Sequence, residues 1–148
     1  MLRLRFALLS EQSSNPLYRR VHPDAERRAR RLFARQLASR SESLLLAEHA
    51  GEVVGILRCA EIDSSPLLLP ERYAYLSSAY VLPEWRRQGV LRQLLAAAEE
   101  WAADRRLDEM RLSAASDSKM ALAAWRALGF IAAEQLHVRP LGGPDGNA

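Results

Sequence analysis

The sequence predicts an α/β fold in which a mixed sheet is covered by helices on both faces. Short apolar runs of strand length alternate with segments whose apolar residues recur at helical spacing, and no internal repeat interrupts this order. The chain has 148 residues, of which 49% are apolar, enough for one core without disulfide or metal support. We therefore expect a single domain over residues 1–140 and a flexible tail over residues 141–148.

The first half of the chain predicts a strand, a helix and a hairpin. Residues 2–6 alternate between apolar side chains and arginine, which is the period-two pattern of a half-buried strand. Apolar residues at helical spacing then predict a basic helix over 24–39. The apolar runs 44–46 and 53–62 flank Ala50-Gly51, so they are expected to form a β-hairpin.

The second half predicts a central strand followed by alternating helices and strands. Residues 73–82 are rich in aromatic side chains and carry no charge, as expected of a strand buried on both faces. The order gives six to seven strands in all. The remaining predicted elements are a helix over 90–102, a strand over 110–112, a helix over 120–128 that ends at Gly129, and final strands at Phe130 and Leu136–Val138.

Charge and cysteine content exclude several classes of protein. The sequence pI is about 9.5, but the net charge is only +3 and Lys119 is the single lysine, so no nucleic-acid partner is expected. No apolar run approaches the roughly 20 residues that cross a bilayer, so no membrane partner is expected. Cys59 is the single cysteine and no secretory pattern opens the chain. We expect a cytoplasmic protein without a metal.

The turn between the central strand and the next helix could bind an anion. The first amides of a helix have no partner within the helix, and the helix dipole places about half a positive charge there. Gly89 would let the backbone approach a phosphate oxygen, and Arg86, Arg87 and Arg92 would supply charge around it. A plain strand-to-helix connection has similar features, so this pattern alone leaves both interpretations open.

Three motifs in order resemble the GNAT N-acetyltransferase superfamily. The stretch Val81-x-Pro83-x-Trp85-Arg86-Arg87-Gln88-Gly89-Val90 resembles its coenzyme A signature, Arg/Gln-x-x-Gly-x-Gly/Ala. Ala121-x-x-x-Trp125-x-x-Leu128-Gly129-Phe130 resembles the family's later helix, and Val53-Val54-Gly55 its usual Val-Gly strand. The resemblance runs from the first predicted strand to Phe130. Glu99-Glu100-Trp101-Ala102 with Ser116-Asp117 is also similar to some aminoglycoside 6'-acetyltransferases.

The resemblance implies a mostly antiparallel sheet with one splayed pair of strands, and acetyl-coenzyme A (acetyl-CoA) bound in the gap between them. The amide of Ala79 would face the thioester carbonyl, where it could stabilise an oxyanion. The other residues that the resemblance places at coenzyme A are Tyr80, Val81, Arg86, Arg87, Gln88, Gly89, Val90, Leu91, Arg92, Ser118, Ala121 and Trp125.

The sequence departs from the family pattern at several positions. Leu91 replaces a Gly or Ala, and Ser118 replaces a frequent Asn. Trp125 replaces the Tyr that often protonates the leaving thiolate, and an indole N–H is not a practical acid. The strand also lacks the Glu that some relatives use as a base. Tyr75 and Ser77 stand in that region and, by strand alternation, share a face with Ala79, so we consider both as catalytic candidates.

Two functions remain open from the sequence. The first is an enzyme that transfers acetyl from acetyl-CoA directly to a primary amine of a small molecule or peptide. The alternative is a module that binds coenzyme A with little or no catalysis, because Trp125 and the missing Glu weaken the chemistry. A homodimer is possible, as it is common among relatives.

Overall fold

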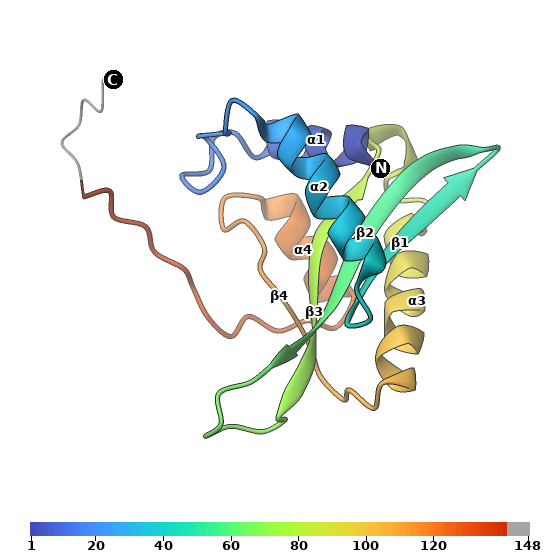
Figure 1. Ribbon diagram of the computed structural model, residues 1–148, viewed down its shortest axis with the longest axis vertical. Helices are drawn as coiled ribbons and strands as arrows, with labels where there is room; N and C mark the ends of the chain where they lie inside the picture. Colours follow the sequence, from blue (N-terminus) through green and yellow to red (C-terminus); the bar gives the residue numbers. More distant parts are fainter. Residues whose placement is uncertain (142–148) are drawn as a thin grey trace.

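The computed structural model describes residues 1–141 and confirms the α/β class (Figure 1). The predicted basic helix, hairpin, central strand and two later helices all form, within a few residues of the expected bounds. The elements are α1 (Leu2–Glu11), α2 (Ala25–Ala38), β1 (Glu42–His49), β2 (Glu52–Asp63), β3 (Arg72–Val81), the 3-10 helix η1 (Pro83–Trp85), α3 (Val90–Asp104), β4 (Met110–Leu112) and α4 (Lys119–Ala127).

The sheet of the described residues has four strands in the order β1-β2-β3-β4, so the prediction of six to seven strands is wrong. β1, β2 and β3 are antiparallel neighbours, and β4 runs parallel to β3. In the β1–β2 hairpin, Ala50 and Gly51 have φ values of 49° and 82°, the positive sign that a two-residue type I′ turn requires. The mixed, mostly antiparallel character of the sheet is confirmed.

The first predicted strand is wrong, because residues 2–11 form helix α1. The alternating pattern covers only five residues, and Ala7, Leu8 and Leu9 break it with three apolar side chains in a row. Leu, Arg and Ala are good helix formers, and no β-branched residue favours a strand here. In the helix, Leu4 is buried and packs with Phe33, Ile56 and Tyr80.

The final strands predicted at Phe130 and Leu136–Val138 do not form. The segment 131–141 contains neither helix nor strand, and every residue in it is exposed (Figure 1). Its apolar side chains are exposed and cover no face of the sheet, so burial does not favour a strand there. The tail predicted over 141–148 lies, apart from Leu141, outside the described residues.

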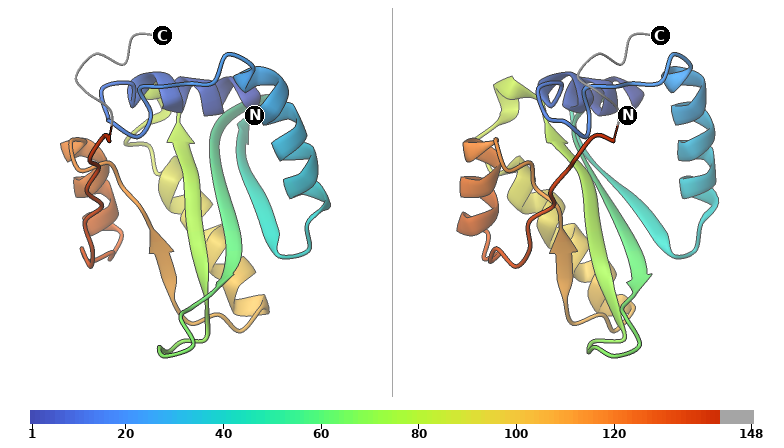
Figure 2. Two further views of the ribbon diagram at one scale, coloured as in Figure 1. Left: turned by 60° about the vertical axis from the view of Figure 1, so that its left-hand side comes forward. Right: turned by 90° about the vertical axis from the view of Figure 1, so that its left-hand side faces the viewer.

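Helices cover both faces of the sheet (Figure 2). On one face, α3 packs its buried side chains against Val54, Leu57, Cys59 and Leu76. On the other face, α1 and α2 bury a smaller cluster around Ile56 and Tyr80. Among residues 1–141, no helix combines the length and apolar character that crossing a membrane requires.

Gly55 sets how closely β2 approaches the first turn of α3. A Cβ at this position would lie 3.1 Å from Leu94 Cδ1 and 3.1 Å from Val90 Cγ1. We expect Gly55→Val to lower the free energy of unfolding by about 1–3 kcal/mol through overpacking. Urea unfolding measures this change, with Gly55→Ala as the milder substitution. Equal stability of all three proteins would show that the helix is not packed tightly here.

Cys59 is fully buried in the main core, and burial raises the pKa of its thiol from 9.0 to about 11. The folded protein therefore keeps the thiol protonated, and we expect no labelling by a thiol reagent at pH 8 until the chain unfolds. Since the pKa is higher in the folded state, the thiol should lower the free energy of unfolding as pH rises from 9.0 to about 11. Fast labelling of the native protein would contradict this burial.

Candidate functional site

The outer edge of β3 is open along its second half. β4 pairs only with Ala74, Tyr75 and Leu76, and beyond this point the two strands diverge (Figure 2). At the end of β3, the Leu82 amide donates to the Val54 carbonyl at 2.9 Å, toward β2. Because backbone groups alternate in direction along a strand, Ala79 and Val81 direct theirs toward the open side. The splayed pair expected from the sequence is present at this position.

A β-bulge at Ser78 divides β3 into two halves. Ile56 pairs with Tyr80 while Arg58 pairs with Ser77, so β3 has one more residue than β2 in this interval. Ser78 accommodates the extra residue with a φ of 55°, which is uncommon outside glycine. The prediction that Ser77 and Tyr75 share a face with Ala79 is therefore wrong. Ala79 packs on the α3 side, whereas Ser77 lies on the opposite face.

The turn after β3 is fastened by contacts that the sequence did not reveal. The Arg86 guanidinium donates to the Val81 carbonyl at 2.9 Å and forms two hydrogen bonds to Glu11 of α1, at 2.7 and 2.9 Å. His49 at the end of β1 packs against Trp85, with ring centroids 4.5 Å apart. These contacts hold the turn against both β1 and α1.

The fastened turn presents a row of backbone amides without acceptors. Arg86 N–H bonds to Pro83, and Gln93 N–H starts the helical ladder by bonding to Gly89. Within residues 1–141, the six amides between them, from Arg87 to Arg92, have no hydrogen-bond acceptor. Gly89 has a φ of 84°, and a Cβ there would meet no atom within 4 Å, so the space beside it is open.

The side chains around the turn divide into free and engaged groups. Arg87, Gly89 and Arg92 are exposed, while Val90 is buried and Leu91 is half-buried against the main core. Gln88 donates to the Glu84 carbonyl at 2.7 Å. The structure thus leaves Arg87 and Arg92 available beside the amides. The Arg86 charge, which was expected there, is instead paired with Glu11.

Tyr80 does not reach the open edge. Its side chain is buried under α1, and its hydroxyl donates to Glu11 at 2.8 Å. Burial, and then this hydrogen bond, raise the pKa of Tyr80, so it stays protonated. Its backbone pairs with Ile56 of β2. Neither part of the residue therefore lines the gap that the sequence assigned to it.

The three predicted residues of the later helix lie at or in α4. Ser118 caps the helix, with its hydroxyl accepting from the Ala121 amide at 3.3 Å. Trp125 is buried and meets Phe130 edge to face, with centroids 5.4 Å apart. Both views of Figure 2 show α4 on the far side of β4 from β3.

Comparison with known proteins identifies the family of this fold. The model of the acetyltransferase (GNAT) family matches residues 8–130. The chain belongs to the GNAT family. It is also 31% identical to aminoglycoside N(6')-acetyltransferase type 1 of Salmonella typhimurium over 74 residues, which cover 50% of this chain and 47% of that protein. The chain thus spans about half the length of the curated relatives it matches.

Two solved structures show the same fold. An aminoglycoside 6'-N-acetyltransferase from Acinetobacter haemolyticus is 26% identical with a TM-score of 0.71, and the match covers 82% of this chain and 85% of that one. A predicted acetyltransferase from Clostridium acetobutylicum, solved with acetyl-CoA, is 20% identical with a TM-score of 0.76, covering 95% and 87%. The second likeness concerns the fold alone.

In this GNAT chain, Ser77 is part of a polar network on the α1 side of the sheet. The Arg58 guanidinium donates to Ser77 Oγ at 3.0 Å and to Glu42 of β1 at 2.7 Å. Tyr75, on the same face, donates to Ser113 at 3.1 Å. Sequence reasoning missed Arg58 and Glu42, since nothing in the spacing of two adjacent strands shows that their side chains meet at Ser77.

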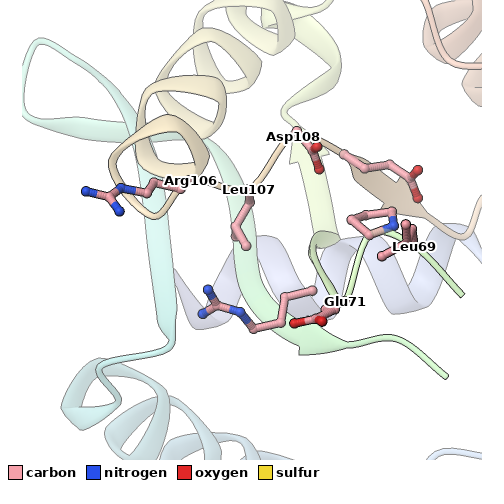
Figure 3. Close-up of a pocket in the computed structure, with 8 residues that line it drawn as sticks. Leu69, Glu71, Arg106, Leu107 and Asp108 are labelled. Atoms are coloured by element: carbon pink, nitrogen blue, oxygen red, sulfur yellow. The ribbon is translucent and has the colours of Figure 1, made fainter. Parts of the chain in front are cut away.

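A cavity lies at the end of the sheet where β3 and β4 begin (Figure 3), whereas the Gly89 turn follows the other end of β3. Its volume is about 580 Å³, and its walls are the segments that precede β3 and β4. Figure 3 shows Arg106 extending away from Glu71 and Asp108. In this GNAT chain the unpaired amides lie at the other end of β3, away from this cavity. In residues 1–141, no three His, Cys, Asp or Glu side chains gather as metal ligands.

Proposed function

We propose that the protein is an N-acetyltransferase that passes acetyl from acetyl-CoA to a primary amine by direct transfer in a ternary complex. The observation that carries this proposal is the row of six amides, Arg87 to Arg92, beside the open edge of β3. Such a row at a helix start suits a diphosphate, and an unpaired strand edge suits the amide groups of a pantetheine arm. Family membership supports the same conclusion.

In the proposed donor site, where acetyl-CoA would bind, particular residues suit the diphosphate and the pantetheine arm of coenzyme A. The diphosphate would accept hydrogen bonds from the amides around Gly89, with Arg87 and Arg92 adding positive charge. The pantetheine arm would extend along Ala79 and Val81, whose backbone groups point toward the gap, although the Val81 carbonyl already accepts a hydrogen bond from Arg86. Ser118, Ala121 and Trp125 would border the arm from the side of α4. Acetyl-CoA supplies a thioester whose carbonyl accepts a nucleophile.

Acetyl transfer in this site needs a neutral amine. The amine nitrogen forms a bond to the carbonyl carbon, the carbon–sulfur bond breaks, and the sulfur leaves as thiolate while the amine loses one proton. The Ala79 amide would stabilise the oxyanion that develops on the carbonyl. An alkyl amine with a pKa near 10.4 costs about 4.6 kcal/mol to neutralise at pH 7, from a gap of roughly 3.4 pKa units.

Strand β3 provides polar groups for water but no carboxylate base, and its Ser77 and Tyr75 lie on the face opposite the Ala79 side chain. Ser77 accepts a hydrogen bond from Arg58, so its own hydroxyl proton is free to orient a water. The Tyr75 hydroxyl donates its hydrogen bond to Ser113. We therefore assign to Ser77, and secondarily to Tyr75, the role of ordering the water that carries the proton away.

The test is release of free coenzyme A thiol from acetyl-CoA on addition of an amine. The acceptors should include an aminoglycoside, because relatives carry that name, together with amino acids and short peptides. Saturable thiol release that depends on both acetyl-CoA and one amine, with the acetylated amine identified by mass spectrometry, is the expected result. Thiol release at the same rate with and without the amine would indicate thioester hydrolysis.

A second candidate function is a coenzyme A binding module with little catalysis. Two features favour it: β3 has Ser77 where a carboxylate base would be expected, and α4 carries Trp125, which is not a practical acid. Saturable thermal stabilisation by coenzyme A, without turnover of any amine, would support this alternative over the enzyme. A cytoplasmic location and a possible homodimer stay predictions.

A further inference from the structure

The α1 side of the sheet carries a guanidinium, Arg58, beside Ser77, the residue proposed above to order the water at the reacting amine. Arg58 contacts Ser77 at 3.0 Å, and its side chain is only 19% exposed. The positive charge of Arg58 is balanced by Glu42, whose carboxylate lies 2.6 Å away and is similarly buried. Arg58 and Glu42 together contribute no net charge, so the net charge of this face depends on the other ionised side chains around it.

A second guanidinium, Arg5, follows Leu4 of α1, and Leu4 packs on Ile56, two residues before Arg58 on the same face of β2. Arg5 is half-buried, and within residues 1–141 it forms neither an ion pair nor a side-chain hydrogen bond. The pKa of Arg5 is lowered, chiefly because burial removes the charge from water; Tyr18 opposes this shift, and repulsion from Arg58 adds to it. A half-buried, unpaired cation is a site that an anion would stabilise.

The other charges on this side do not cancel Arg5. Glu11 forms an ion pair with Arg86 and accepts a hydrogen bond from Tyr80. On β4, Glu109 pairs with Arg111, whose guanidinium stacks 3.9 Å from the centre of the Tyr73 ring. A further carboxylate, Asp117, is exposed and accepts hydrogen bonds of 3.5 Å from Ser14 and Asn15. Because water screens an exposed charge far more than a partly buried one, Asp117 offsets little of the charge on the half-buried Arg5.

We infer that the acceptor amine also carries a carboxylate, which Arg5 binds with help from Arg58, as in a peptide with an acidic residue close to its amino terminus. This inference rests on the proposed acetyl transfer and narrows its acceptor class. A polycationic acceptor such as an aminoglycoside would place further positive charge against Arg5 and Arg58, which is unfavourable in a partly dry site. The same two cations favour the neutral form of a nearby amine, which is the form that reacts.

A matched pair of acceptors tests the inference. Gly-Gly-Asp-amide and Gly-Gly-Asn-amide present the same amino terminus and differ only by one negative charge. We expect kcat/KM for the Asp peptide to exceed that for the Asn peptide by about 10-fold at low salt, the size expected for one charge-assisted hydrogen bond. The ratio should fall as the ionic strength rises.

Three variants of α1 locate the effect. Arg5→Met should bring the ratio to about 1, and Arg5→Lys, which keeps the charge, should retain most of it. Arg3→Met is the matched control, because Arg3 is an exposed arginine on the same helix, and it should leave the ratio unchanged. Coenzyme A affinity should be the same in all three variants, since α1 touches the donor turn through Glu11 and not through Arg5.

The outcomes separate this inference from the proposed function. A ratio near 1 in the unmodified protein, or an equal loss in Arg3→Met, overturns the inference. Faster turnover of kanamycin than of either peptide also overturns it, while it confirms acetyl transfer. If no amine is acetylated, the proposed function fails. Calorimetry of the two peptides on the protein loaded with coenzyme A then decides the inference, and equal affinities overturn it.

Discussion

The Gly89→Asp variant is expected to bind coenzyme A at least about 100-fold more weakly than the unmodified protein. Gly89 has a φ of 84°, a left-handed conformation that costs a non-glycine residue roughly 1–2 kcal/mol. The new carboxylate would also stand among the six unpaired amides, where it would repel the diphosphate and take hydrogen bonds in its place. Isothermal titration calorimetry with coenzyme A measures the effect directly.

Two substitutions separate the causes of that loss. Gly89→Asn has the same size and tolerates the left-handed region, so it should lose much less affinity than Gly89→Asp if charge dominates. Gly51→Asp is the control for backbone strain, because Gly51 in the β1–β2 turn has a φ of 82° and equally open surroundings. Gly51→Asp should change the stability of the fold and leave the affinity for coenzyme A unchanged. Full affinity in Gly89→Asp, with the fold intact, would remove the donor site from this turn.

The central part of the fold was predictable because its signals are local. The turn at Gly89 follows a strand that Pro83 ends and precedes a helix with a clear apolar face, so its position could be read from about twenty residues. The first amides of any helix have no hydrogen-bond acceptor within that helix. The donor half of the candidate site therefore follows from the sequence.

The acceptor half was not predictable, because long-range contacts decide it. The bulge at Ser78 depends on how β3 pairs with β2, and it moves Ala79 to the face opposite Ser77. The contact of Arg58 with Ser77 joins different strands. Glu11, which holds Arg86 and Tyr80, lies in α1, where a five-residue alternation had predicted a strand. Periodicity cannot establish such pairings, since each depends on tertiary packing.

The Leu94→Ala variant should show that the donor turn draws its geometry from the main core. Leu94 is 3% exposed and packs beneath the first turn of α3, where it faces Gly55. Removing three carbon atoms there is expected to lower the free energy of unfolding by about 2–5 kcal/mol. That is a large share of the roughly 5–15 kcal/mol that stabilises a typical domain.

Coenzyme A should partly restore this variant, because a ligand that binds only the folded state stabilises it by mass action. Leu67→Ala is the matched control: Leu67 is 90% exposed, so the same truncation should change the stability by less than about 0.5 kcal/mol. Thermal unfolding of both variants, with and without coenzyme A, measures all of these changes. Similar losses in Leu94→Ala and Leu67→Ala would mean that α3 is not anchored through Leu94. The amides of its first turn would then need another source of order to hold a diphosphate.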